Sequence, residues 1–171
     1  MQQHLEKRVE ERTLEIERRR KVAESMRDII RMINTNMPLE QFLDEAVVLA
    51  AEQMGASGCV LHEFNIDEQT LYYRACHGMK GITEKNTIRQ FADFKATGTD
   101  GYYQTTLQRN PTFGNYTRFK DRGISLIKND PTIPDHIKAR RIKSHERFSA
   151  VLTVPLFIQD RPWGGMIFYY S

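Results

Sequence analysis

The sequence has few cysteines and prolines and no long apolar run, and these shortages exclude several classes of protein. Two cysteines among 171 residues allow at most one disulfide and cannot form a four-cysteine zinc site. The longest unbroken apolar run, residues 46–51, is far shorter than the roughly 18 residues of a membrane-spanning helix. No apolar signal-peptide segment follows Met1. We therefore expect a cytoplasmic chain with free thiols and no membrane contact by this segment.

The sequence also has little net charge. Its 25 basic and 22 acidic side chains leave a formal charge of +3, which does not by itself indicate a nucleic-acid partner. Hydrophobic residues make up 40% of the chain and charged residues 27%. This balance suits one globular domain with an attached charged segment.

Residues 1–36 are the charged segment, which we interpret as a signalling or coiled-coil helix. Residues 1–31 contain nine Lys/Arg and seven Asp/Glu, with no Pro or Gly, and this composition favours a helix. Apolar residues recur with the 3.5-residue period of a coiled-coil seam, interrupted by Arg12 and Arg19. The predicted dimerisation residues are Leu5, Val9, Ile16, Ala23, Met26, Ile30 and Ile33.

A parallel two-stranded coiled coil would bury this seam and make the protein a homodimer. The alternative is a single solvated helix that packs on its own domain. In either case Glu15, four residues before Arg19, adds local support to the helix.

Residues 37–171 have the pattern of a globular domain. Pro38 can open a helix at its first turn, and Gly55 is placed to end it. Two pairs of β-rich segments, each separated by a short polar turn, predict two hairpins: 59–64 with 71–76, and 148–157 with 163–170.

The middle of the domain is less regular. Residues 79–130 show no sustained period, and we expect short helices there around 88–94 and 102–108. Asp135 is expected to cap a basic helix that runs to about Ser144. The order of elements predicts an α+β fold, a central antiparallel sheet with helices on one face, preceded by the long N-terminal helix.

One succession of motifs resembles a known family. A helix ends in Ala-Glu-Gln-Met-Gly-Ala at 51–56, and a strand runs from Leu71 to His77-Gly78. The strand Ser-Ala-Val-Leu-Thr-Val-Pro-Leu at 149–156 is followed by Trp-Gly-Gly-Met-Ile at 163–167. This succession resembles a GAF domain. The first 30 residues resemble the signalling helices that precede such domains in bacterial sensor histidine kinases and diguanylate cyclases.

The resemblance implies a non-catalytic regulatory sensor of a two-component or related signalling protein, which passes a signal through a dimeric helix to an output domain. Family members usually continue past the final strand into a closing helix. Because the sequence ends at Ser171, we expect a segment of a longer protein that lacks this helix.

The resemblance also implies a small-molecule pocket between the sheet and the irregular middle. Rings interleaved with polar groups are typical of such pockets, although they can equally fill a core. The candidate ligand-binding residues are Phe64, Tyr73, His77, Phe91, Phe94, Tyr102, Tyr103, Tyr116 and Arg118. The ligand is unknown, and no metal-binding spacing is found among the histidines.

Cysteine chemistry offers two sharper hypotheses. Phytochrome-like GAF domains anchor a bilin through a cysteine shortly before the strand that corresponds to 148–156. Here residues 136–145 contain no cysteine, which argues against a covalent bilin. The alternative function is a small redox enzyme similar to free methionine sulfoxide reductases, with Cys59 and Cys76 on neighbouring strands. Two buried thiols in a sheet are more often inert core residues.

A basic segment spans residues 118–147, where nine Lys/Arg face four Asp/Glu. A solvated helix face explains most such clusters. The alternative is an anionic ligand, such as a cyclic nucleotide, held by arginine near Asp135. The cyclic-nucleotide signature of phosphodiesterase GAF domains is absent from the sequence.

Overall fold

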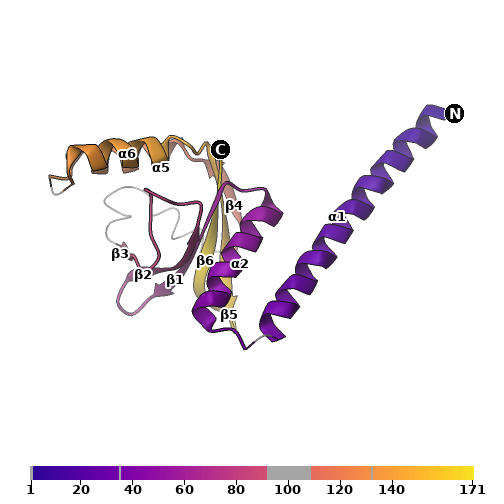
Figure 1. Ribbon diagram of the computed structural model, residues 1–171, viewed down its shortest axis with the longest axis horizontal. Helices are drawn as coiled ribbons and strands as arrows, with labels where there is room; N and C mark the ends of the chain where they lie inside the picture. Colours follow the sequence, from indigo (N-terminus) through magenta and orange to yellow (C-terminus); the bar gives the residue numbers. More distant parts are fainter. Residues whose placement is uncertain (1, 35, 92–108, 132) are drawn as a thin grey trace. The chain divides into compact units, whose positions relative to one another are not determined.

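The structure is a computed structural model that describes residues 2–34, 36–91, 109–131 and 133–171. The chain divides into two compact units, Met1–Phe42 and Leu43–Ser171, which are described separately. Figure 1 shows the elements, which in chain order are α1 (Gln2–Asn34), α2 (Leu39–Met54), β1 (Gly58–Asn65), β2 (Thr70–His77), β3 (Ile88–Gln90), β4 (Thr112–Asn115), α5 (Thr117–Asn129), α6 (Asp135–His145), β5 (Ala150–Ile158) and β6 (Arg161–Tyr170).

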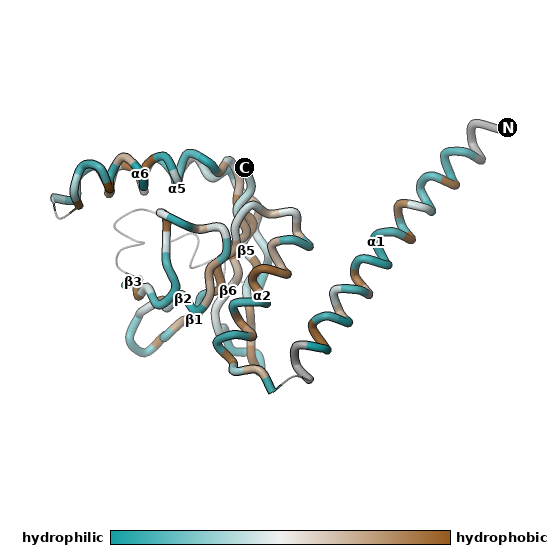
Figure 2. The backbone as a smooth tube through the Cα atoms, in the orientation of Figure 1, coloured by the Kyte–Doolittle hydropathy of each residue, from teal (hydrophilic) through white to brown (hydrophobic). Residues whose placement is uncertain are grey.

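The predicted N-terminal helix is confirmed as α1, a continuous helix of 33 residues. Local side-chain contacts support it: Glu15 and Arg19 form the expected ion pair at 2.6 Å, and the Thr13 hydroxyl donates to the Val9 carbonyl. Figure 2 shows apolar positions recurring along an otherwise hydrophilic helix. Such a helix has too few apolar residues to be stabilised by burial within its own chain.

The second unit is built on a six-stranded antiparallel sheet with the strand order β3-β2-β1-β6-β5-β4. Both predicted hairpins are present, and β1 pairs with β6 to join them. The β5–β6 turn holds Gln159 and Asp160 at φ of 47° and 65°. Two successive left-handed residues are the geometry that matches the twist of a two-residue hairpin.

The helix α2 covers one face of the sheet, which we call the α2 face. Val47 and Ala51 are one helical turn apart and are both buried there. The core on this face consists of Val47, Ala51, Cys59, Leu61, Ala75 and Phe168. Figure 2 shows the hydrophobic stretches of α2 and of the central strands. The confirmed fold class is therefore α+β.

The opposite face of the sheet, which we call the aromatic face, carries most of the buried rings. One cluster there consists of Val60, Met79, Tyr116, Phe148, Val151 and Ile167, with Tyr73, Cys76, Ile82 and Tyr169 packed against it. A second consists of Phe64, Leu71 and Phe91, and Tyr73 packs against it as well. Tyr73 thus links the two clusters.

A β-bulge in β2 changes which side chains reach each face. The register pairs Leu61 with Ala75 but His62 with Tyr73, so that Arg74 is the extra residue between the two pairs. One extra residue shifts the alternation of a strand by one step. Tyr73 therefore points to the aromatic face while Ala75 points to the α2 face.

The sequence made three local predictions for the middle of the chain: a helix around 88–94, a helix around 102–108 and a helix cap at Asp135. The helix predicted around 88–94 is wrong at its start, because Ile88–Gln90 forms the edge strand β3 and pairs with β2. The helix predicted around 102–108 lies outside the described residues. Pro134, not Asp135, is the N-cap of α6, and Asp135 is its first helical residue. The strand β4 and the helix α5 were not predicted at all.

Candidate functional site

The candidate site lies on the aromatic face, where strand β1 presents two rings. The side chains of His62 and Phe64 are two residues apart on β1 and therefore on the same side of the sheet. Their ring centroids are 5.1 Å apart. Phe91 meets Phe64 edge to face at 5.7 Å, the arrangement that the ring quadrupoles favour.

His62 is the polar group at the centre of this face, and its side chain is fully buried. A Cβ atom on Gly165 would lie only 3.0 Å from His62 Cε1, so the glycine on β6 makes room for the ring. Burial lowers the pKa of His62 to about 3, because the charged imidazolium would lose its hydration. At neutral pH the face therefore contains a neutral imidazole.

Tyr116 forms the second polar centre of the aromatic face. Its ring is buried and packs edge to face against Phe148 and Tyr169 at 6.0 and 5.6 Å. Its hydroxyl lies 2.7 Å from His145 Nδ1, and the two rings are nearly parallel. Burial raises the pKa of Tyr116 and lowers that of His145, so both groups are neutral at pH 7.

Tyr73 joins the two groups of rings. Burial raises the pKa of its hydroxyl, and Arg89, which is hydrogen-bonded to that hydroxyl, acts in the opposite direction. His62, Tyr73, Tyr116 and His145 are thus neutral hydrogen-bonding groups at pH 7, and the Arg89 guanidinium beside Tyr73 is a cation. Rings with a few neutral polar groups can bind a planar or apolar small molecule by stacking, burial and directed hydrogen bonds.

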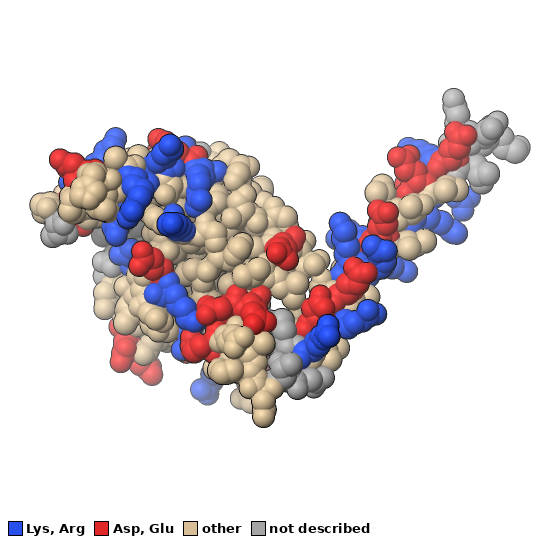
Figure 3. All heavy atoms as spheres, viewed as in Figure 1, with Lys and Arg blue, Asp and Glu red and all other residues tan. Residues whose placement is uncertain are grey.

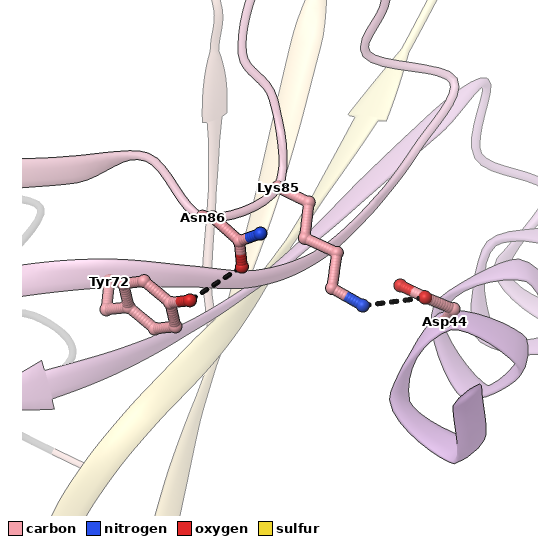
Figure 4. Close-up of polar contacts among 4 residues, drawn as sticks. All are labelled: Asp44, Tyr72, Lys85 and Asn86. Atoms are coloured by element: carbon pink, nitrogen blue, oxygen red, sulfur yellow. Dashed lines mark hydrogen bonds and ion pairs between the residues drawn. The ribbon is translucent and has the colours of Figure 1, made fainter. Parts of the chain in front are cut away.

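The loop between β2 and β3 is held by contacts with α2 and with β2. Lys85 Nζ lies 2.7 Å from Asp44 Oδ2 on α2, and the Tyr72 hydroxyl donates to Asn86 Oδ1 at 2.6 Å. Figure 4 shows both contacts. The backbone N–H of Asn86 also donates to the Tyr73 carbonyl. These contacts hold the segment that leads into β3 and, after it, to Phe91.

The structure brings together four of the nine predicted ligand-binding residues: Phe64, Tyr73, Phe91 and Tyr116. His77 does not join them. It pairs with Cys59, which faces α2, so the bulge at Arg74 places His77 on the opposite side of the sheet from Tyr73. His77 therefore lies apart from the other described candidates, and its part in ligand binding stays a prediction. Phe94, Tyr102, Tyr103 and the side chain of Arg118 lie outside the described residues.

Sequence reasoning missed the roles of His62, Phe148 and Tyr169, and of His145 as the partner of Tyr116. A signal for His62 was present, because Val60, His62 and Phe64 alternate along one predicted strand. The Tyr116–His145 contact joins residues 29 positions apart. No local pattern in the sequence predicts such a pair.

The two cysteines lie on neighbouring strands but serve different clusters. Cys59 is buried on the α2 face, whereas Cys76 packs against the cluster on the aromatic face. Burial raises the pKa of Cys59 to about 12 and that of Cys76 to about 11. Because the thiolate is the reactive form, neither position favours redox chemistry at neutral pH.

The basic segment 118–147 forms α5, α6 and the turn between them, which we call the α5–α6 hairpin. Figure 3 shows Lys and Arg side chains gathered there. Two of the basic residues hold the fold together: Lys138 Nζ donates to the Lys128 carbonyl, and the Arg147 guanidinium donates to the Gly78 carbonyl. Arg140, Arg141 and Lys143 are exposed. Binding of an anion by this segment stays a prediction.

The predicted dimerisation residues of α1 with described side chains are all exposed: Val9, Ile16, Ala23, Met26 and Ile30. The side chains of Leu5 and Ile33 lie outside the described residues. Val22 and Ile29 are exposed as well and widen the apolar stripe. A stripe of this kind is typical of a helix that packs against a partner.

Neither metal ligation nor a membrane span is found in the part of the chain that the structure describes. There, no three His, Cys, Asp or Glu side chains are grouped so that they could hold a metal ion. In the same ranges no helix is both long and apolar enough to cross a membrane.

Several solved structures share the fold of this chain. The phycocyanobilin-bound GAF domain of a cyanobacterial phytochrome is 11% identical, with a TM-score of 0.56 over 87% of this chain and 79% of that one. The GAF domain of A. aeolicus nlh2 in an inactive state is 12% identical, with a TM-score of 0.54 over 90% and 82%. The GAF domain of a phosphoenolpyruvate-protein phosphotransferase from Coxiella burnetii is 18% identical, with a TM-score of 0.54 over 86% and 76%.

No curated protein matches the chain by sequence. The profile of the GAF domain family, in contrast, matches residues 38–171, which include the whole sheet and both of its covered faces. The chain therefore belongs to the GAF domain family.

Proposed function

We propose that this chain is the regulatory sensor module of a larger bacterial signal-transduction protein. In this proposal a small molecule binds without a covalent bond on the aromatic face. The helix α1 pairs with its copy in a second chain and passes the signal to an output domain. The observation that carries the proposal is the group of rings around the neutral His62, on a fold whose relatives include a phycocyanobilin-bound domain.

Signal transfer requires that the ligand bind one helix arrangement more tightly than another. A ligand with equal affinity for both arrangements would change nothing. The exposed stripe of α1 supplies a seam that a partner helix can cover, and the arginines at 12 and 19 weaken that seam. A weakened seam suits a dimer with two arrangements of similar free energy.

The dimer is tested by a charge placed in the seam. We expect Ile16→Glu to weaken self-association of the full chain at least tenfold, because each copy loses the burial of one isoleucine, about 1.5 to 3 kcal/mol, and gains a charge. Leu14→Glu is the matched control: Leu14 is 62% exposed and Ile16 66%, but Leu14 lies off the seam. Sedimentation equilibrium measures both. Equal association of the two variants would contradict a dimer through this seam.

The ligand is tested by native mass spectrometry and an absorption scan above 300 nm on the purified full chain. We expect a bound small molecule that is released on unfolding and lost in Phe91→Leu, because that ring closes the group around Phe64. Phe113→Leu is the control, since Phe113 is 73% exposed and contacts Tyr170 instead. Protein that never carries a small molecule, or that keeps it in Phe91→Leu, would speak against the aromatic face as the binding site.

A further inference from the structure

The end of the α5–α6 hairpin is attached to the rest of the domain by polar contacts. No residue of α6 is buried. Among the described residues, two side chains at its end make polar contacts: the His145 ring lies 2.7 Å from the Tyr116 hydroxyl, and the Arg147 guanidinium lies 2.8 Å from the Gly78 carbonyl and 5.0 Å from the Phe148 ring centroid. An element with little apolar burial opens more easily than the sheet to which it is attached.

The His145 ring lies close to both Tyr116 and the helix α5. Its ring plane is within 6° of that of Tyr116. On the other side, a Cβ atom on Gly123 of α5 would lie 3.1 Å from His145 Cε1. Ser144, the preceding residue, packs more closely still against Gly81 in the turn after β2, where a Cβ atom would lie 2.5 Å from Ser144 Oγ. The imidazole therefore contacts both α5 and the buried tyrosine, and its burial depends on the docked position of the hairpin.

Protonation of His145 works against this arrangement. In the docked state the imidazolium would be a partly buried charge beside the Tyr116 hydroxyl, which is neutral at pH 7. The charged residues that flank these contacts in the sequence are the exposed Arg141 and Arg147 on the same segment as His145 and, on α5, the half-buried Lys120 and the exposed Asp121. Burial is the cause that lowers the pKa of His145. The adjacent Glu146 is exposed to solvent. In an undocked hairpin the ring is hydrated and takes up a proton at its ordinary pKa.

We propose that the Tyr116–His145 contact is a proton-sensitive latch that holds the α5–α6 hairpin against the aromatic face and releases it in mild acid. The latch is a property of the fold and does not require a ligand. It goes beyond the proposed sensor function, because release of the hairpin changes the cover over Tyr116 whether or not a small molecule binds there. One proton shifts the docked population by at most tenfold per pH unit.

Hydrogen exchange of the full chain at pH 7, 6 and 5, corrected for intrinsic rates, tests the latch. Protection of amides in 120–129 and 137–145 should fall by up to tenfold per pH unit below 6.5 and stay below that of Val60 and Ile167 in the sheet, whose protection follows the global stability of the domain instead. His145→Gln keeps a hydrogen-bonding side chain without a titrating ring, and its hairpin protection should be independent of pH. His136→Gln is the control, because His136 is exposed on the same helix, and it should behave like the wild type.

Two outcomes would overturn the latch: wild-type hairpin protection that is unchanged between pH 7 and 5, or an unchanged pH dependence in His145→Gln. Should that variant fail to fold, an NMR titration of the wild-type chain decides. The latch requires the His145 Cε1–H resonance to titrate together with the amides of Gly123 and Gly81. Titration of the ring with no change at either glycine would reject it.

Discussion

Gly164→Ala is expected to destabilise the domain by about 3 kcal/mol or more, the upper range for overpacking a closed site. A Cβ atom on Gly164 would lie 2.0 Å from the backbone oxygen of His62 and 3.0 Å from Glu63 Cα. Both contacts are with the backbone of β1, the strand paired with β6, so no side chain can turn aside. The methyl group can be accommodated only if β1 and β6 separate at the centre of the sheet.

Gly114→Ala is the matched control for this prediction. Gly114 also lies within a strand, but nothing stands within 4 Å of its Cβ position. Since glycine costs a strand about 0.5 to 1 kcal/mol relative to alanine, this change should be neutral or slightly stabilising. Thermal unfolding should lower the Tm of Gly164→Ala by about 6 to 12 °C and leave that of Gly114→Ala within a few degrees. Similar melting of the two variants would show that β1 yields readily at Gly164.

Acid is expected to destabilise the folded domain through His62. Its folded pKa of about 3 lies below the ordinary value of 6.5, so between these values the unfolded chain binds more protons than the folded chain. Stability is therefore fully present above pH 6.5 and is lost as the pH falls toward 3. The slope approaches about 1.4 kcal/mol per pH unit, which amounts to a loss of about 2 kcal/mol at pH 5.

Urea unfolding at several pH values measures this effect. His62→Gln removes the titrating ring and should flatten the profile between pH 6.5 and 4 relative to the wild type, although the variant starts from a lower stability at pH 7. His136→Gln, on the exposed face of α6, should keep the wild-type slope. Carboxylates titrate in the same range, so only the difference between the two profiles reports on His62. Parallel profiles for wild type and His62→Gln would contradict its burial.

Local patterns in the sequence predicted much of the fold. The 3.5-residue apolar period predicted α1, helical spacing after Pro38 predicted α2, and polar turns between β-rich segments predicted both hairpins. Such elements are encoded by residues close together in the chain. The short strands β3 and β4 were missed because three or four residues carry too little periodicity, and each is held by the longer strand beside it.

The candidate site was predictable only in part. Phe64, Tyr73 and Phe91 were expected to approach one another and do so. His77 was among the same candidates, and a regular strand would have placed it on the same face as Tyr73. The extra residue at Arg74 reverses that alternation, and the same step places Cys59 and Cys76 on opposite faces. A bulge depends on the pairing with the neighbouring strand, which β2 alone does not reveal.

The sequence by itself determined a long charged helix with an apolar stripe, followed by an α+β domain whose motifs resemble a GAF domain. These features depend on composition and on short periods, which hold wherever the segment lies. Only the tertiary structure showed that His62 is buried among rings, that Gly164 and Gly165 leave space for β1, and that Tyr116 meets His145. Each of these contacts joins residues far apart in the chain, and each arises because the sheet brings its strands to within one side-chain length of one another.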